Sequence, residues 1–270
     1  MKNNQILLRQ LNIVEKHEQK FLNHKENTLV KSKFTPVINK IQASIPAKLS
    51  STLDIAFYKG FQFVFEKGNS YVEKTYNKGK IDSEYDLNNY AIDKYMNKKH
   101  LKNIDKQSKQ SKTINESIAA LEGGVLGLLG IGLPDIPLFI AVIIRTINEI
   151  ALSYGYQYQT DSEKAYILYL ICGAMTKEDQ QKKYNEKIDC LAKNIDSNAN
   201  TGIQLAAIMK ETSDLLSNTL LTAKFIQGLP VVGVIGGVVN PLIINKIGKY
   251  ARIKYRKRYL IRKISAIGHQ

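Results

Sequence analysis

The chain has 270 residues, of which 44% are hydrophobic and 23% charged, values that argue against a disordered protein. Its two cysteines, Cys172 and Cys190, cannot build a disulfide framework, and they indicate reduced thiols in a cytoplasmic protein. The first apolar run ends at Arg9 and is too short for the core of a signal peptide.

The formal net charge of +15 is unevenly distributed along the sequence. Residues 1–112 carry a net charge of +10, residues 113–214 a net charge of −5, and residues 215–270 hold ten basic and no acidic side chains. This polarity favours an oriented contact with an anionic partner over the uniform charge of a general nucleic-acid binder.

Helical periodicity marks the first part of the chain. Apolar residues spaced by three, four and seven positions predict an amphipathic helix over 6–22, and a second stripe predicts a helix from Pro46 that ends at Gly68. Residues 97–112 are polar and lysine-rich, which predicts a solvated linker or an exposed helix. We therefore divide the chain into a polar and helical extension, 1–45, and a helical domain, 46–265.

An apolar segment from Ser117 to Ile144 is interrupted by the run Gly132-Leu133-Pro134-Asp135-Ile136-Pro137. Proline lacks a backbone N–H and restricts the residue before it, so a continuous helix should break in this run. Asp135 can cap the next helix and Pro137 suits its first turn. We expect a helical hairpin whose second arm extends to about Tyr154, with Gly155 as its stop.

The second half of the chain continues with helix signals. Thr160 and Glu163 fit a capping box for a helix to about Met175, and two more helices are expected, one ending near Ile195 and one over 202–226. Gly228-Leu229-Pro230 then repeats the earlier motif within 21 uncharged residues. The predicted fold is an all-α helical bundle with two apolar hairpins that contain glycine and proline.

The apolar segments leave three interpretations open. A membrane-spanning helix needs about 20 apolar residues, and neither arm of the first hairpin is that long before it meets proline or Arg145. Burial of both hairpins in an all-α core is the first possibility, and shallow insertion into a membrane is the second. The third applies to the second segment only, which is long enough to span a membrane.

A basic tail follows the second apolar segment directly. Lysine and arginine near an anionic leaflet contribute about 1 kcal/mol each, so the tail could hold the protein on a membrane. A solvated charged helix face is the alternative, and nucleic acid is not expected because no binding module is recognisable. The cations of the basic tail are Lys246, Lys249, Arg252, Lys254, Arg256, Lys257, Arg258, Arg262 and Lys263.

The sequence offers no positive sign of catalysis. No nucleophile elbow, phosphate-binding loop or histidine–carboxylate metal motif is present, so neither a metal nor another cofactor is expected. Asp135, Arg145 and Glu149 are the ionisable groups on or next to the apolar helix. Arg145 and Glu149 are spaced to form a structural pair, and a hydrolase-like site built from all three residues is the alternative.

Several stretches resemble the EcsC family. They are 130–140 with Gly-Ile-Gly-Leu-Pro-Asp-Ile-Pro, Arg145–Ile150, Ser153-Tyr-Gly-Tyr156, Pro46–Gly60, and Gly228-Leu-Pro-Val-Val-Gly233 with Asn240 and the basic tail. The family is named for a protein encoded beside an ABC transporter. The resemblance implies the helical fold and a membrane-proximal setting, and it supplies no catalytic residues.

We therefore expect a cytoplasmic accessory protein at the inner face of the membrane. Its basic tail and apolar hairpins would contact anionic lipid, and its partner would be a membrane transporter or another protein of a transport or stress system. An enzyme with a site around Asp135, Arg145 and Glu149 is the second hypothesis.

Overall fold

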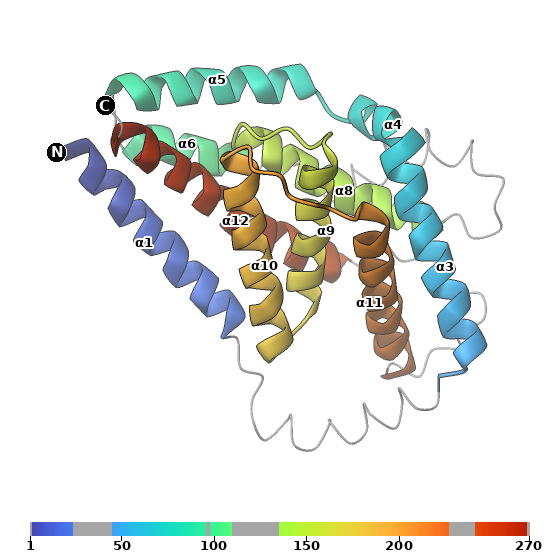
Figure 1. Ribbon diagram of the computed structural model, residues 1–270. Helices are drawn as coiled ribbons and strands as arrows, with labels where there is room; N and C mark the ends of the chain where they lie inside the picture. Colours follow the sequence, from blue (N-terminus) through green and yellow to red (C-terminus); the bar gives the residue numbers. More distant parts are fainter. Residues whose placement is uncertain (1, 24–44, 96–97, 110–134, 227–240, 269–270) are drawn as a thin grey trace.

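The computed structural model describes residues 2–23, 45–95, 98–109, 135–226 and 241–268, and all regular structure in these ranges is helical (Figure 1). The predicted all-α class is confirmed. The helices are α1 (Lys2–Leu22), α3 (Ala47–Phe63), a turn of π-helix η1 (Val64–Gly68), α4 (Asn69–Lys74), α5 (Lys78–Tyr95), α6 (Lys98–Gln107), α8 (Asp135–Ser153), α9 (Asp161–Met175), α10 (Glu178–Asp196), α11 (Leu205–Ile226) and α12 (Pro241–Gly268).

Five helices pack in a closed circuit. α8 contacts α3, α3 contacts α11, α11 contacts α9, α9 contacts α12, and α12 returns to α8. The remaining helices lie outside this circuit: α1 lies along α12, α10 along α9, and α5 crosses α8 with α6 beside it (Figure 1). The core of the protein is therefore shared by segments that are far apart in the sequence.

α8 is the most apolar helix, and it runs through this core. One segment of the described chain, Ile136–Ser153, is long and apolar enough to cross a membrane by length and composition, yet 94% of it is buried inside the fold. An apolar helix that is buried in this way belongs to the core of the fold. The fold therefore accounts for the apolar character of this arm.

The end of α8 follows the prediction closely. Gly155 has a φ of +74°, its N–H donates to the Leu152 carbonyl, and the Tyr156 N–H donates to the Ala151 carbonyl. These two bonds make a Schellman motif, in which glycine takes the left-handed position. Pro137 lies buried in the first turn of α8, and Asp135 begins the helix.

Other sequence predictions have mixed outcomes. The N-cap at Thr160 is confirmed, because its side chain accepts from the Glu163 N–H at 3.2 Å, but the Glu163 carboxylate binds Arg258 and does not complete the capping box. Residues 98–107 form a helix rather than a linker, and the buried side chains of Leu101 and Ile104 fix it to the fold. Gly132, Leu133, Pro134, Gly228 and Pro230 lie outside the described residues, and so do the turns of both predicted hairpins.

α1 shares the core of the rest of the protein. Leu7 and Val14 are fully buried, and Phe21 stacks on Tyr250 of α12 with ring centroids 4.7 Å apart. Gln10 contacts Arg256, further along α12, so the two helices are antiparallel. The expected boundary at residue 45 thus separates two segments that pack against each other.

Substitution of Gly155 by alanine tests the packing at the end of α8. A Cβ there would lie 2.1 Å from Cζ of Tyr85, and the left-handed backbone adds strain. We expect the free energy of unfolding to fall by roughly 2–5 kcal/mol, from about 1–2 kcal/mol of backbone strain and about 1–3 kcal/mol of overpacking. Urea denaturation measures this difference.

Gly202→Ala is the matched control. Gly202 has a φ of +56°, but nothing lies within 4 Å of its added Cβ. Only the backbone strain of roughly 1–2 kcal/mol should appear in this variant. Equal losses in the two variants would contradict a packing role for the Gly155–Tyr85 contact.

Candidate functional site

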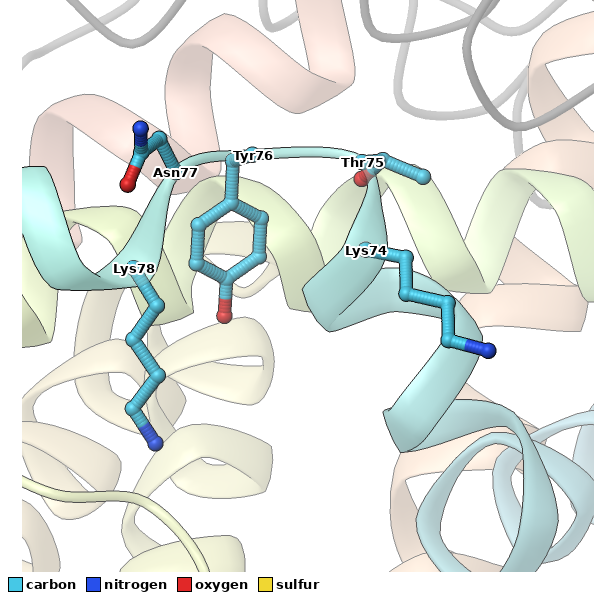
Figure 2. Close-up of a pocket in the computed structure, with 5 residues that line it drawn as sticks. All are labelled: Lys74, Thr75, Tyr76, Asn77 and Lys78. Carbon is cyan, nitrogen blue, oxygen red and sulfur yellow. The ribbon is translucent and has the colours of Figure 1, made fainter.

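The turn between α4 and α5 forms an open pocket of about 450 Å³. Figure 2 shows the ring of Tyr76 descending from this turn between the side chains of Lys74 and Lys78. The Asn77 side chain accepts from the Lys80 N–H at 2.9 Å and so caps α5, which fixes the turn. The lining residues are Lys74, Thr75, Tyr76, Asn77 and Lys78.

A chain of hydrogen bonds begins at Tyr76. Its hydroxyl lies 2.7 Å from the hydroxyl of Tyr158, and Tyr158 donates to Oε1 of Glu73 at 2.7 Å. Because Tyr158 has one hydroxyl hydrogen, it accepts from Tyr76 and donates to Glu73. Burial raises the pKa of Tyr76 and of Tyr158 above the ordinary value, so both phenols are neutral at physiological pH.

Arg145 and Glu149 lie next to Tyr76. The Arg145 Nε donates to Oε1 of Glu149 at 2.7 Å, and both side chains are buried. The Arg145 guanidinium lies 5.9 Å from the centroid of the Tyr76 ring. The predicted structural pair is confirmed, whereas the side chain of Asp135 lies outside the described part of the chain.

The polar cluster formed by Glu73, Tyr76, Arg145, Asn148, Glu149 and Tyr158 has few features of a catalytic centre. Cys172 lies outside this cluster, on α9, where burial raises the pKa of its thiol to about 12 and its Sγ lies 3.3 Å from Oγ1 of Thr212, so it is protonated at neutral pH. Within the described ranges, no group of three His, Cys, Asp or Glu side chains could hold a metal ion. The arrangement offers binding groups rather than a nucleophile with its base.

The cations of the basic tail lie on α12, where two lysines point into the fold. The Lys254 Nζ lies 2.6 Å from Oε1 of Glu18, 2.5 Å from Oδ1 of Asp189 and 2.9 Å from Oδ1 of Asn185. Lys257 binds the other oxygens of the same two carboxylates, at 2.7 Å and 3.0 Å. This network joins α1, α10 and α12.

Arg258, one helical turn after Lys254, makes a second network. It donates to both carboxylate oxygens of Glu163, at 2.8 Å and 3.1 Å, and its Nε donates to Asp196. Burial acts to lower the pKa of Arg258, but the hydrogen bonds to Asp196 and Glu163 outweigh burial and raise it. The guanidinium also lies 4.2 Å from the centroid of the Tyr156 ring.

Arg262 holds the end of α8. Its Nη2 donates to the carbonyl of Tyr154 at 3.3 Å and to the hydroxyl of Tyr85 at 3.1 Å. Its guanidinium lies 4.4 Å from the Tyr156 ring centroid, so Tyr156 contacts both Arg258 and Arg262. The Tyr-Gly-Tyr motif is therefore the place where α8 is fastened to α12.

The other tail cations differ in exposure. Arg256 pairs with Asp105 at 2.9 Å, and Lys263 pairs with Asp93 at 2.5 Å. Arg252 and Lys246 are half-buried, and burial lowers the pKa of Arg252; Lys249 is the exposed member of the nine. Internal partners thus bind most of the charges expected to face lipid, and the membrane contact itself stays a prediction.

Sequence reasoning missed several members of the polar cluster. Tyr76 and Tyr158 are 82 positions apart, and no motif connects them. Asn148 could have been found, because it lies three positions after Arg145 and so on the same face of a helix. Glu73 gave no signal beyond its charge.

Comparison with protein families agrees with the resemblance that the sequence motifs indicate. The EcsC protein family matches residues 8–260. The match begins within α1 and ends within α12, so it includes Glu18, Asn185, Asp189 and Lys254 of the network that joins α1, α10 and α12. No curated protein and no solved structure matches the chain.

Lys254→Met should be strongly destabilising. The substitution removes the partner of buried Glu18, and breaking a buried ion pair from one side costs about 3–5 kcal/mol. Lys249→Met, on the exposed face of the same helix, should change the free energy of unfolding by less than about 0.5 kcal/mol. Urea denaturation of both variants distinguishes an internal role of these cations from a solvated one, which would give similar small effects.

The two thiols should differ in reactivity. Cys190 is exposed, whereas Cys172 is buried and its pKa is raised to about 12. Under native conditions an aromatic disulfide reagent should modify Cys190 rapidly and Cys172 only after denaturation. Cys190→Ser should abolish the native reaction; a fast native reaction in that variant would contradict the burial of Cys172.

Proposed function

The chain belongs to the EcsC protein family, and we propose that it is a cytoplasmic accessory protein that associates with the anionic inner face of a membrane. There it would serve a transport or stress system through a transporter or another membrane-associated partner. The observation that carries this proposal is a surface of exposed lysine and aromatic side chains on the neighbouring helices α5 and α6.

α6 supplies the positive charge of this surface. Lys98, Lys102 and Lys106 are spaced four residues apart, so they share one exposed face, and Leu101 and Ile104 hold the opposite face in the core. Asp105 is the acidic residue of this helix, and it pairs with Arg256 of α12. Because that carboxylate is engaged inside the fold, the outer face of α6 keeps its positive charge.

α5 adds side chains suited to a membrane interface. Leu87 and Tyr90 are 71% and 63% exposed, and Tyr95, at the end of the helix that leads to α6, is 61% exposed. The Lys94 Nζ lies 5.7 Å and 5.4 Å from the ring centroids of Tyr90 and Tyr95. Tyrosine and lysine combine an apolar body with a polar end, which suits the boundary between lipid headgroups and acyl chains.

The α5–α6 surface replaces the basic tail in our proposal. Five of the nine tail cations pair with carboxylates of the same chain, so their charge is neutralised locally. The lysines of α6 retain the long-range attraction that an anionic leaflet exerts on exposed cations. We therefore assign the lipid contact to α6 and to the adjoining end of α5.

Vesicle co-sedimentation tests this assignment. Full-length protein should bind vesicles of equal parts phosphatidylglycerol and phosphatidylcholine at low salt and dissociate as salt rises, because screening shortens the Debye length. The triple variant Lys98→Gln, Lys102→Gln, Lys106→Gln should bind roughly 100-fold more weakly, from about 1 kcal/mol for each lysine.

The control removes the same charge from another helix. Lys182, Lys183 and Lys193 are exposed on α10, and their replacement by glutamine lowers the net charge equally. This triple variant should keep most of the binding. Equal losses in the two variants would contradict the role of α6, and no binding by the unmodified protein at low salt would exclude the membrane association.

A further inference from the structure

Two neighbouring side chains of α8 hold polar atoms without protein partners. In the described structure, Nη1 and Nη2 of Arg145 and both side-chain polar atoms of Asn148 are buried and make no hydrogen bond of normal geometry, while the Asn148 amide lies close enough to the Tyr76 hydroxyl to act against the rise in its pKa. The two residues lie three positions apart, on one face of the helix. They present a fork of four guanidinium N–H groups beside an amide that can both donate and accept.

A bound ligand would satisfy these buried polar atoms. Leaving one buried donor or acceptor unsatisfied costs about 1–3 kcal/mol, and the cost is larger for a charged group. Of the Arg145 nitrogens, Nε donates to Glu149, and Tyr76 directs its hydroxyl to Tyr158. The rest of the guanidinium therefore remains available inside the fold.

Tyr76 connects this place to the open pocket. Tyr76 lines the pocket and also contacts the Arg145 guanidinium, so its ring stands between solvent and the buried fork. Lys74 and Lys78 lie on either side of Tyr76 at the pocket (Figure 2). Lys78 lies 3.8 Å from Glu73, and Lys74 lies 5.4 Å from the ring centroid of Tyr71. Two lysine side chains therefore flank Tyr76 at the pocket.

We propose that Arg145 and Asn148 bind a phosphate group that carries a hydrogen, either inorganic phosphate or a phosphomonoester, which enters past Tyr76. The guanidinium fork matches two phosphate oxygens in the bidentate geometry typical of arginine. The Asn148 amide donates to a third oxygen, and its Oδ1 accepts from the P–OH. Sulfate, at neutral pH, and carboxylate lack this hydrogen, so Oδ1 disfavours both ligands. This inference is independent of the membrane contact at α6.

Calorimetric titration of the full-length protein tests the site. At equal ionic strength near pH 6.5, inorganic phosphate should bind at least tenfold more tightly than sulfate. Asn148→Leu should weaken phosphate binding at least tenfold, and it should keep or raise the melting temperature, because an apolar side chain of similar size replaces an unsatisfied amide. Equal affinity for phosphate and sulfate, or unchanged phosphate binding in this variant, would overturn the proposal.

A second titration uses variants of the two lysines that line the pocket. The double variant Lys74→Gln, Lys78→Gln should weaken phosphate binding by about two- to fivefold through loss of local positive charge, while the pair Lys182→Gln, Lys183→Gln on α10 should not. If the two double variants weakened phosphate binding equally, the phosphate would be attracted by the net charge of the protein alone. That result would overturn entry past Tyr76.

A further titration with a soluble lipid identifies the source of the phosphate group. Dihexanoyl phosphatidic acid is water-soluble and carries the same monoester group on a lipid. Tighter binding than inorganic phosphate, lost in Asn148→Leu, would support a lipid headgroup, and binding of inorganic phosphate alone would support a soluble ligand. Binding of the lipid that Asn148→Leu leaves unchanged would contradict its capture at this site.

Discussion

The fold depends on the burial of positive charge along α12. This helix carries lysines and arginines on several of its faces and no acidic residue, so it can enter a core only where other helices supply carboxylates. Those carboxylates come from α1, α5, α6, α9 and α10, each of which contributes at least one partner. Ion pairs therefore join α12 to each of these five helices, while α8 also packs on it.

This arrangement changes the meaning of the charge distribution. The excess of basic residues at the end of the chain is balanced by Glu18, Asp93 and Asp105 from the first part and by Glu163, Asp189 and Asp196 from the middle. What resembles an external docking tail in the sequence is largely the complement of acids elsewhere in the same molecule. On α6, by contrast, Lys98, Lys102 and Lys106 face outward while the carboxylate of Asp105 pairs with Arg256 inside the fold.

α8 combines two kinds of burial. Its aliphatic residues fill the core, and its polar residues Arg145, Asn148 and Glu149 occupy one side. One end is fastened to α12 through the Tyr-Gly-Tyr motif and Arg262, so this side is held in a fixed position relative to Tyr76. A site with its polar groups already in place loses little conformational entropy when a ligand binds. The packing of α8 thus supports the phosphate proposal in physical terms.

The sequence by itself determined the helical class, the family, the end of α8 at Gly155, the N-cap at Thr160 and the Arg145–Glu149 pair. The helix end, the cap and the pair depend on residues within about four positions of one another, where backbone geometry and side-chain type decide the outcome. Only the tertiary structure decided where the charges of α12 point and which groups gather around Tyr76. Lys254 and Glu18 are 236 positions apart, and a run of cations can pair equally well with lipid or with distant carboxylates until packing brings one of them into contact.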